Sequence, residues 1–172
     1  MSPAAWQSVR LVAGSQGAWF ACVLGAANGT PWIGVVVTAA WAAAWVVGRG
    51  RRRADLAFLS YVGALGYLVD SIIVSVGAFG FPDAAHLGGP SPLWMVALWV
   101  GFGTTLRTLG PLLPLPWAAM ALGAVAGPLA YSGGVALGAA HFGADTVTSR
   151  VVIGAAWAVA MPLLVVLERR VR

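Results

Sequence analysis

Charged residues are scarce in this chain of 172 residues, where they make up 9% of the sequence. A soluble domain carries roughly a quarter charged residues, so the deficit excludes an ordinary cytosolic fold, a disordered chain and a nucleic-acid-binding module. Lysine is absent, and all ten basic residues are arginine. The single cysteine, Cys22, excludes a disulfide framework and a thiolate metal cluster.

Apolar residues are abundant instead: they account for 60% of the chain, and the mean hydropathy is +0.86. They form six runs, each long enough for a helix that spans most of a hydrocarbon core of about 30 Å. The sequence predicts an all-α, polytopic transmembrane bundle of six helices in a single domain, with spans at about 11–27, 32–48, 56–79, 93–109, 117–140 and 150–167. Six spans use about 120 residues, which leaves too little chain for an extramembrane domain with its own core.

The arginines are distributed unevenly between the two sides of this bundle. With the amino terminus inside, nine of the ten lie on the inner side, at positions 10, 49, 51, 52, 53, 107, 169, 170 and 172, and only Arg150 lies outside. By the positive-inside rule we expect both termini in the cytoplasm and the protein in an inner membrane. The four arginines within 49–53 could also bind anionic lipid or nucleic acid, but a role in topology explains them without a further function.

Asp70 is the most informative residue, because it lies within the third apolar run. A carboxylate in hydrocarbon costs several kcal/mol unless it is protonated, paired or hydrated, so it should face the bundle interior. Residue counts place Asp70 and Tyr131 at the same depth, each about 21 Å along its helix. We therefore expect a polar layer of Asp70, Ser71, Tyr131 and Ser132. Its role stays open between an interhelical hydrogen bond and a functional acid or base.

Small residues accompany Asp70 on one side of its helix. Gly63 and Gly77 each lie seven residues from Asp70, and Gly66 and Tyr67 fall on the same side. Such a seam allows neighbouring helices to approach closely. We expect this side to pack inside the bundle.

A second polar layer is expected nearer the arginine-rich side, where Gln16, Thr104, Thr105 and Arg107 lie in the first and fourth runs. Threonine hydroxyls can bond back to their own helix, and an arginine near a helix end can extend to the interface. The alternative is that Gln16 and Arg107 line a pocket for a lipid phosphate or another anion.

Aromatic and histidine side chains give weaker signals. Trp19 and Trp99 lie within apolar runs, where they either pack or stack on a flat or polyene ligand. His86 and His141 lie in two loops near aspartates, and imidazole and carboxylate together could form a metal site, but no His-Glu-x-x-His or Cys-x-x-Cys pair is present. We expect neither a metal nor a cofactor, since no nucleophile arrangement, phosphate-binding loop or dinucleotide fingerprint occurs.

Several stretches resemble a known family. They are QGAWFACVLGA at 16–26, GYLVDS at 66–71, PLW at 92–94, the Thr104-Thr105 pair and GPLAY at 127–131. Together they resemble the small bacterial membrane proteins catalogued as domain of unknown function 2878, over nearly the whole chain. The resemblance implies a bacterial inner-membrane protein without an assigned activity. Genes of this family often lie near genes for enzymes that modify membrane fatty acids, so the resemblance also implies a lipid-related role. Arg107 departs from the pattern, since a smaller polar residue is typical there, and this argues against the anion pocket.

The leading interpretation is a non-catalytic or accessory membrane protein that binds a lipid or small apolar molecule among its helices. Its candidate binding residues are Gln16, Trp19, Tyr67, Asp70, Trp99, Thr104, Thr105, Arg107 and Tyr131. A membrane-embedded lipid-modifying enzyme is the second interpretation, with Asp70 as acid or base and Tyr131 as its partner. A proton-coupled carrier or a membrane subunit of a transporter is the third. The expected partners are membrane lipids, and a homo-oligomer or a membrane partner protein stays open.

Overall fold

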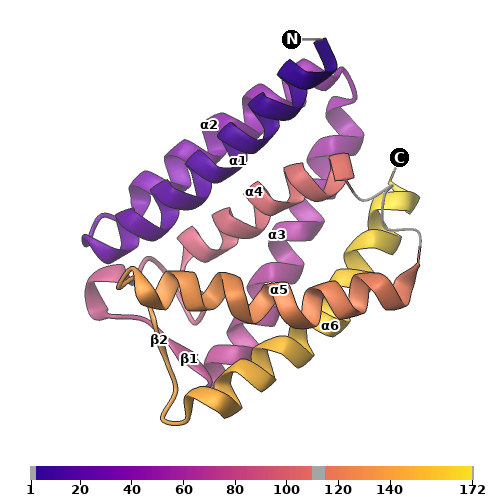
Figure 1. Ribbon diagram of the computed structural model, residues 1–172. Coiled ribbons are helices and arrows are strands. Elements are labelled where there is room, and N and C mark those ends of the chain that lie inside the picture. Colours follow the sequence, from indigo (N-terminus) through magenta and orange to yellow (C-terminus); the bar gives the residue numbers. More distant parts are fainter. Residues whose placement is uncertain (1–2, 110–114, 172) are drawn as a thin grey trace.

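The computed structural model describes residues 3–109 and 115–171 (Figure 1). Its helices are α1 (Pro3–Ala27), α2 (Trp32–Arg49), α3 (Arg52–Ser75), α4 (Leu93–Leu109), α5 (Pro116–Ala136) and α6 (Thr146–Arg170). A short 3-10 helix, η1 (Asp83–Ala85), precedes α4, and two strands of two residues each, β1 (Phe79–Gly80) and β2 (His141–Phe142), pair antiparallel. The prediction of an all-α protein with six helices is confirmed.

Five helices are long and apolar enough to cross a membrane: α2, α3, α5, α6 and the Val9–Ala27 part of α1. The α4 helix has 17 residues and is therefore about 26 Å long. It packs against α1, α2 and α3, and also contacts α6. Five of the six predicted spans are thus helices that are long and apolar enough to cross a membrane, while a crossing by α4 stays a prediction.

Two of the expected spans end too late. The α3 helix stops at Ser75 instead of 79, because Gly77 takes a left-handed φ of 72° and Ala78 N–H donates to the Ile73 carbonyl. Gly138 (φ 82°) ends α5 in the same way, at Ala136 instead of 140. Glycine adopts this conformation without the steric cost of a Cβ atom. Gly77 therefore belongs to a helix cap and not to the seam around Asp70.

The carboxyl ends of α3 and α5 lead into the pairing of β1 with β2. Phe79 lies opposite Phe142, and Gly80 lies opposite His141. The α6 helix then begins at Thr146, four residues earlier than expected, because the Asp145 carboxylate accepts hydrogen bonds from the Val147 and Thr148 amides at 3.1 and 3.2 Å. This N-cap satisfies amides that would otherwise lack partners.

Two helical hairpins lie on either side of α3 and α4. The α1 and α2 helices pack along each other, as do α5 and α6, while α3 and α4 join the two hairpins (Figure 1). The α5 helix packs mainly against α6, whereas α4 packs against the first three helices. As a result, α5 faces α1 and α4 with little direct helix packing, and the candidate functional site lies between them.

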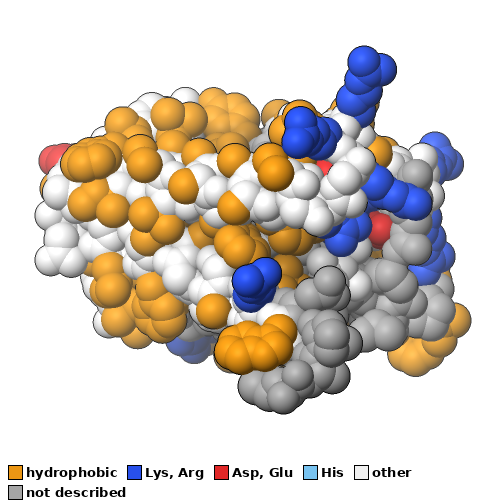
Figure 2. Space-filling model, turned by 90° about the horizontal axis from the view of Figure 1, so that it is seen from above, with side chains coloured by type: hydrophobic (Ala, Val, Ile, Leu, Met, Phe, Trp, Pro, Cys, Tyr) orange, Lys and Arg blue, Asp and Glu red, His pale blue; other side chains and the backbone are white. Residues whose placement is uncertain are grey.

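The arginines gather at one end of the bundle (Figure 2). That end contains the start of α1, the α2–α3 connection and the carboxyl end of α6, and it carries the exposed residues Arg10, Arg49, Arg51, Arg52, Arg53, Arg169 and Arg170. Arg150 lies near the opposite end, where its guanidinium sits over the Phe142 ring at 5.2 Å. This is the spatial asymmetry expected from the sequence, and the side of the membrane on which this end lies stays a prediction.

Candidate functional site

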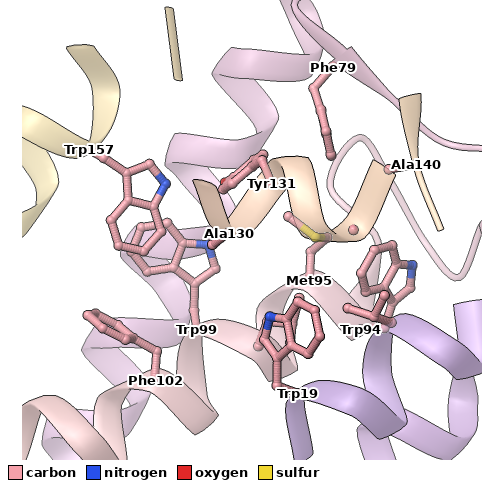
Figure 3. A pocket seen from close by; sticks show the side chains of 13 residues that line it. Trp19, Phe79, Trp94, Met95, Trp99, Phe102, Ala130, Tyr131, Ala140 and Trp157 are labelled. Carbon is pink, nitrogen blue, oxygen red and sulfur yellow. The ribbon is translucent and has the colours of Figure 1, made fainter. Parts of the chain in front are cut away.

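An aromatic cavity of about 120 Å³ lies between α1, α4 and α5 (Figure 3). We call it the aromatic pocket. The α4 helix lines it with Trp94, Met95, Leu98, Trp99 and Phe102. The other lining residues are Trp19 and Val23 of α1, Ala130, Tyr131 and Gly134 of α5, Trp157 of α6, Phe79 of β1, and Ala140.

The pocket exists because α4 and α5 present side chains of different size to it. Residues 94, 95, 98, 99 and 102 follow helical spacing, so that bulky side chains of α4 fall on one face. The facing part of α5 supplies Ala130 and Gly134, one turn apart. Gly134 is buried, yet a Cβ atom there would meet no atom within 4 Å. The small residues of α5 therefore leave space that the large residues of α4 do not fill.

Asp70 lies directly behind the wall of this pocket. It is 1% exposed, and the Tyr131 hydroxyl donates a hydrogen bond to its Oδ1 atom. The Trp99 indole N–H donates to Oδ2 at 2.8 Å. The expected burial of Asp70 and its pairing with Tyr131 are confirmed. Trp99 was expected either to pack or to stack on a ligand, and its bond to Asp70 is a contact that the sequence did not predict.

The rest of the expected polar layer does not join this cluster. The Ser132 hydroxyl donates to the Pro128 carbonyl of its own helix at 2.7 Å. The Ser71 hydroxyl is buried and has no hydrogen-bond partner within the described residues. The carboxylate of Asp70 is thus satisfied by two wall residues of the pocket and not by the neighbouring serines.

Close helix packing holds the Trp99 indole in place. A Cβ atom at Gly66 would overlap the Trp99 ring, so only glycine lets α3 approach α4 at this level. On its other side Trp99 stacks on Trp157, with ring centroids 4.4 Å apart and planes 14° from parallel. The aromatic wall therefore has a fixed orientation, set by Gly66, Asp70 and Trp157 together.

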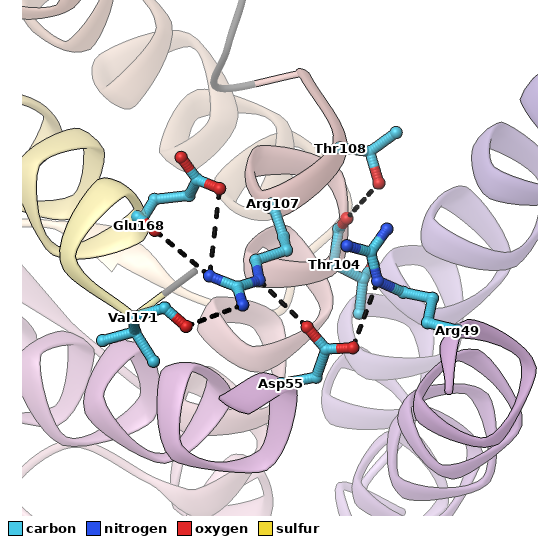
Figure 4. A network of polar contacts seen from close by, with 7 residues as sticks. All are labelled: Arg49, Asp55, Thr104, Arg107, Thr108, Glu168 and Val171. Atoms are coloured by element: carbon cyan, nitrogen blue, oxygen red, sulfur yellow. Dashed lines mark hydrogen bonds and ion pairs between the residues drawn. The ribbon is translucent and has the colours of Figure 1, made fainter. Parts of the chain in front are cut away.

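Arg107 is buried in a charged network at the arginine-rich end (Figure 4). Its Nε atom donates to Asp55 Oδ1 at 3.0 Å, and the other oxygen of Asp55 accepts from Arg49 Nε at 3.2 Å. The remaining nitrogens donate to the carbonyls of Glu168 and Val171 at 3.2 and 3.1 Å, and one lies 3.8 Å from Glu168 Oε1. The network joins α3, α4 and α6, and Arg49 adds the carboxyl end of α2.

Two expectations for Arg107 are wrong. The side chain does not extend to the interface, since it is 3% exposed. It does not form an anion pocket with Gln16 either, because its guanidinium is enclosed by protein acceptors and Gln16 lies in a separate cavity. Sequence reasoning missed Asp55 and Glu168 as its partners. The available signal was that each acid lies near a helix end that is rich in arginine.

A second cavity of about 140 Å³ lies between α1, α2 and α4, and we call it the α1–α4 cleft. Polar side chains that line it are Ser15, Gln16, Thr38 and Thr105. Gln16 and Thr105 are thus brought together as expected, without Arg107.

Thr104 and Tyr67 line neither described cavity. The Thr104 hydroxyl donates to the Gly101 carbonyl at 2.7 Å and accepts from the Trp41 indole at 3.1 Å. The Tyr67 hydroxyl donates to the Gly89 carbonyl at 3.0 Å. Both residues therefore connect elements of the fold.

The two histidines lie at the loop end of the bundle, and both are exposed. His86 packs edge-on against the Phe81 ring, and His141 lies against Gly80 in the strand pair. Asp145 is engaged with the start of α6, where the bonds from Thr148 and Val147 hold the pKa of its carboxyl below the usual range. Across residues 3–109 and 115–171, no group of three or more His, Cys, Asp or Glu side chains could hold a metal ion.

The comparisons with known proteins identify a family but no activity. The model of the family described as "Protein of unknown function (DUF2878)" matches residues 9–163. No curated protein and no solved structure matches the chain.

Proposed function

The chain belongs to the DUF2878 family of proteins of unknown function, and we propose its function from the aromatic pocket. The protein is a multi-pass protein of the bacterial inner membrane that binds a lipid chain or another small apolar molecule without transforming it. One observation carries this proposal: Gly134 is buried and yet faces open space between aromatic walls. Apolar cavities with rigid aromatic linings are typical binding sites for small molecules.

The arrangement of Asp70 favours binding over catalysis. One of its oxygens accepts a hydrogen bond from Trp99 and the other accepts one from Tyr131. The carboxylate itself lies behind the pocket wall. An enzyme or a proton-coupled carrier would need a reactive or titrating group in contact with its substrate. Among the described lining residues, Tyr131 carries the only hydroxyl, and that hydroxyl donates to Asp70. In this proposal Asp70 therefore has a structural role: it holds the side chains of Trp99 and Tyr131 in the pocket wall.

Filling the pocket tests the proposal directly. Gly134→Leu places a side chain in the open space, and we expect it to lower the occupancy of co-purifying apolar molecules by about tenfold. Native mass spectrometry of gently extracted protein measures this occupancy. Gly17→Leu is the matched control, because Gly17 is an exposed helical glycine with nothing within 4 Å of its Cβ position.

Two outcomes would contradict the proposal. If wild-type protein carries no bound apolar molecule and takes up none when it is offered, the pocket is not a binding site. If Gly134→Leu folds and retains its ligand as well as Gly17→Leu does, the ligand binds elsewhere. A comparison of thermal unfolding shows that both variants are folded before occupancy is compared.

A further inference from the structure

The aromatic pocket and the α1–α4 cleft adjoin each other. Both are lined by Trp19, Leu98 and Phe102, and all three side chains are half-buried. The pocket extends along α4 towards Trp94, and the cleft extends the other way towards Thr105. The two cavities therefore lie end to end along α1 and α4 with these three side chains between them, and the hydroxyl and amide side chains of Ser15, Gln16, Thr38 and Thr105 line only the cleft.

We propose that the ligand is a single-chain amphiphile with an uncharged polar head. Its chain lies in the aromatic pocket, and its head lies in the α1–α4 cleft beside Gln16 and Thr105. This inference rests on the proposed function and adds to it the class of ligand and the direction in which it lies.

The length of the two cavities together fits one hydrocarbon chain. Trp94 and Thr105 are eleven residues apart on α4, which corresponds to about 16 Å along the helix axis. This is about half of a hydrocarbon core of roughly 30 Å, and so about the depth of one leaflet. A chain that long extends from the polar cleft to Trp94.

The chemistry of the cleft selects an uncharged head. Gln16 and Thr105 line the cleft, and neither side chain makes a hydrogen bond to another described residue. An amide and a hydroxyl supply donors and acceptors for a hydroxyl or an ester group. A phosphate is bound best by arginine, but Arg107 is enclosed by protein acceptors. Arg10 does not line the cleft either, since it lies six residues before Gln16 on α1, about 9 Å away along the axis.

Three probes with the same chain separate the alternatives: 1-dodecanol, dodecyl phosphate and dodecane. They are titrated against the purified full-length protein in amphipol, and binding is measured by native mass spectrometry. We expect 1-dodecanol to bind about tenfold more tightly than either of the others, because only its head gains hydrogen bonds in the cleft. Dodecyl phosphate that binds as tightly as the alcohol, or more tightly, would overturn the inference.

Variants locate the head and separate the two proposals. The double variant Gln16→Leu, Thr105→Val should bind 1-dodecanol no better than dodecane. Thr108→Val is the control, since Thr108 lies on α4 outside both cavities and its hydroxyl donates to the Thr104 carbonyl at 3.0 Å. If the double variant binds like wild type while Gly134→Leu weakens all three probes, this inference fails and the proposed function stands. If Gly134→Leu weakens none of them, the proposed function fails as well.

Discussion

Asp70 connects three helices through a single carboxylate. It belongs to α3, Trp99 donates to it from α4, and Tyr131 donates to it from α5. A carboxylate away from water needs hydrogen bonds on both oxygens, because an unsatisfied buried acceptor carries the full cost of its desolvation. The site is therefore sensitive to the loss of either donor.

The first prediction concerns the phenol of this cluster. Tyr131→Phe leaves the ring in place and removes the donor to Asp70 Oδ1, so we expect it to lower the free energy of unfolding by about 1–2 kcal/mol. Unfolding of the purified protein in sodium dodecyl sulfate measures the change. Tyr61→Phe is the control, because Tyr61 is exposed on α3. Equal stability of the two variants would show that the bond to Asp70 contributes nothing.

Residue counting could predict part of this cluster. In the predicted spans Asp70 and Tyr131 lie equally far from helix starts at the same end of the bundle, so a common depth follows from the helical rise, although α3 itself begins four residues earlier than predicted, at Arg52. The bond from Trp99 does not follow from spacing. It depends on the rotation of α4 against α3, which Gly66 permits and no local pattern specifies.

The start of α6 depends on one exposed carboxylate. Asp145 accepts from the amides of Val147 and Thr148 and from the Thr148 hydroxyl, and these bonds lower its pKa. A carboxyl whose pKa is lowered on folding stabilises the folded state above its ordinary pKa of about 3.9, and the contribution disappears as the pH falls through the lower folded value.

The second prediction is a pH dependence at this cap. Asp145→Asn keeps one oxygen acceptor but does not titrate, so we expect wild type to be the more stable protein at neutral pH. The difference should shrink as the pH is lowered below about 3.9. Thermal unfolding of the two proteins over this pH range measures it. A difference that stays constant with pH would show that the charge of Asp145 has no part in the cap.

Arg107 fixes the ends of three helices to one another. Its partner Asp55 belongs to the first turn of α3, and its carbonyl acceptors belong to the last residues of α6 and to Val171. Removal of one member of a buried ion pair leaves its partner charged and incompletely paired. The third prediction concerns this loss of a buried partner.

Arg107→Met should lower the free energy of unfolding by about 3 kcal/mol, since Asp55 would keep only Arg49 as a partner. Arg150→Met is the matched control, because Arg150 is exposed at the opposite end, and its effect should stay within about 0.5 kcal/mol. Denaturation of both variants under identical conditions compares them. An Arg107→Met protein as stable as the control would contradict the structural role of the network.

At the scale of elements, hydropathy locates the helices but not all of their ends or contacts. Long apolar runs predict where helices lie, whereas the ends of α3 and α5 depend on Gly77, Gly138 and the strand pair that follows. Arg107 lies near a helix end, a position typical of a side chain that extends to the interface. Its partner Asp55 is 52 residues away in the sequence, so this contact is visible only once the bundle is assembled.

At the scale of the whole molecule, charge gives the bundle a direction. The exposed arginines at the start of α1, at the α2–α3 connection and at the carboxyl end of α6 lie at one end (Figure 2). The opposite end carries β1, β2 and η1, with Arg150 as the only arginine of the described chain there. Arginine-rich segments are retained in the cytoplasm during insertion, which predicts the orientation of the whole bundle.

The fourth prediction tests this orientation by cysteine labelling in cells. Cys22 is the only cysteine of the chain and is buried, so Cys22→Ala gives a background without thiols. Arg53→Cys and Asp83→Cys then add one exposed thiol at each end of the bundle. We expect a membrane-impermeant maleimide to label Asp83→Cys in intact spheroplasts and to label Arg53→Cys only after the membrane is broken. The reverse pattern would place the arginine-rich end outside. The α1–α4 cleft is the cavity nearer to that end, so the polar head of the proposed ligand would then lie towards the outer leaflet.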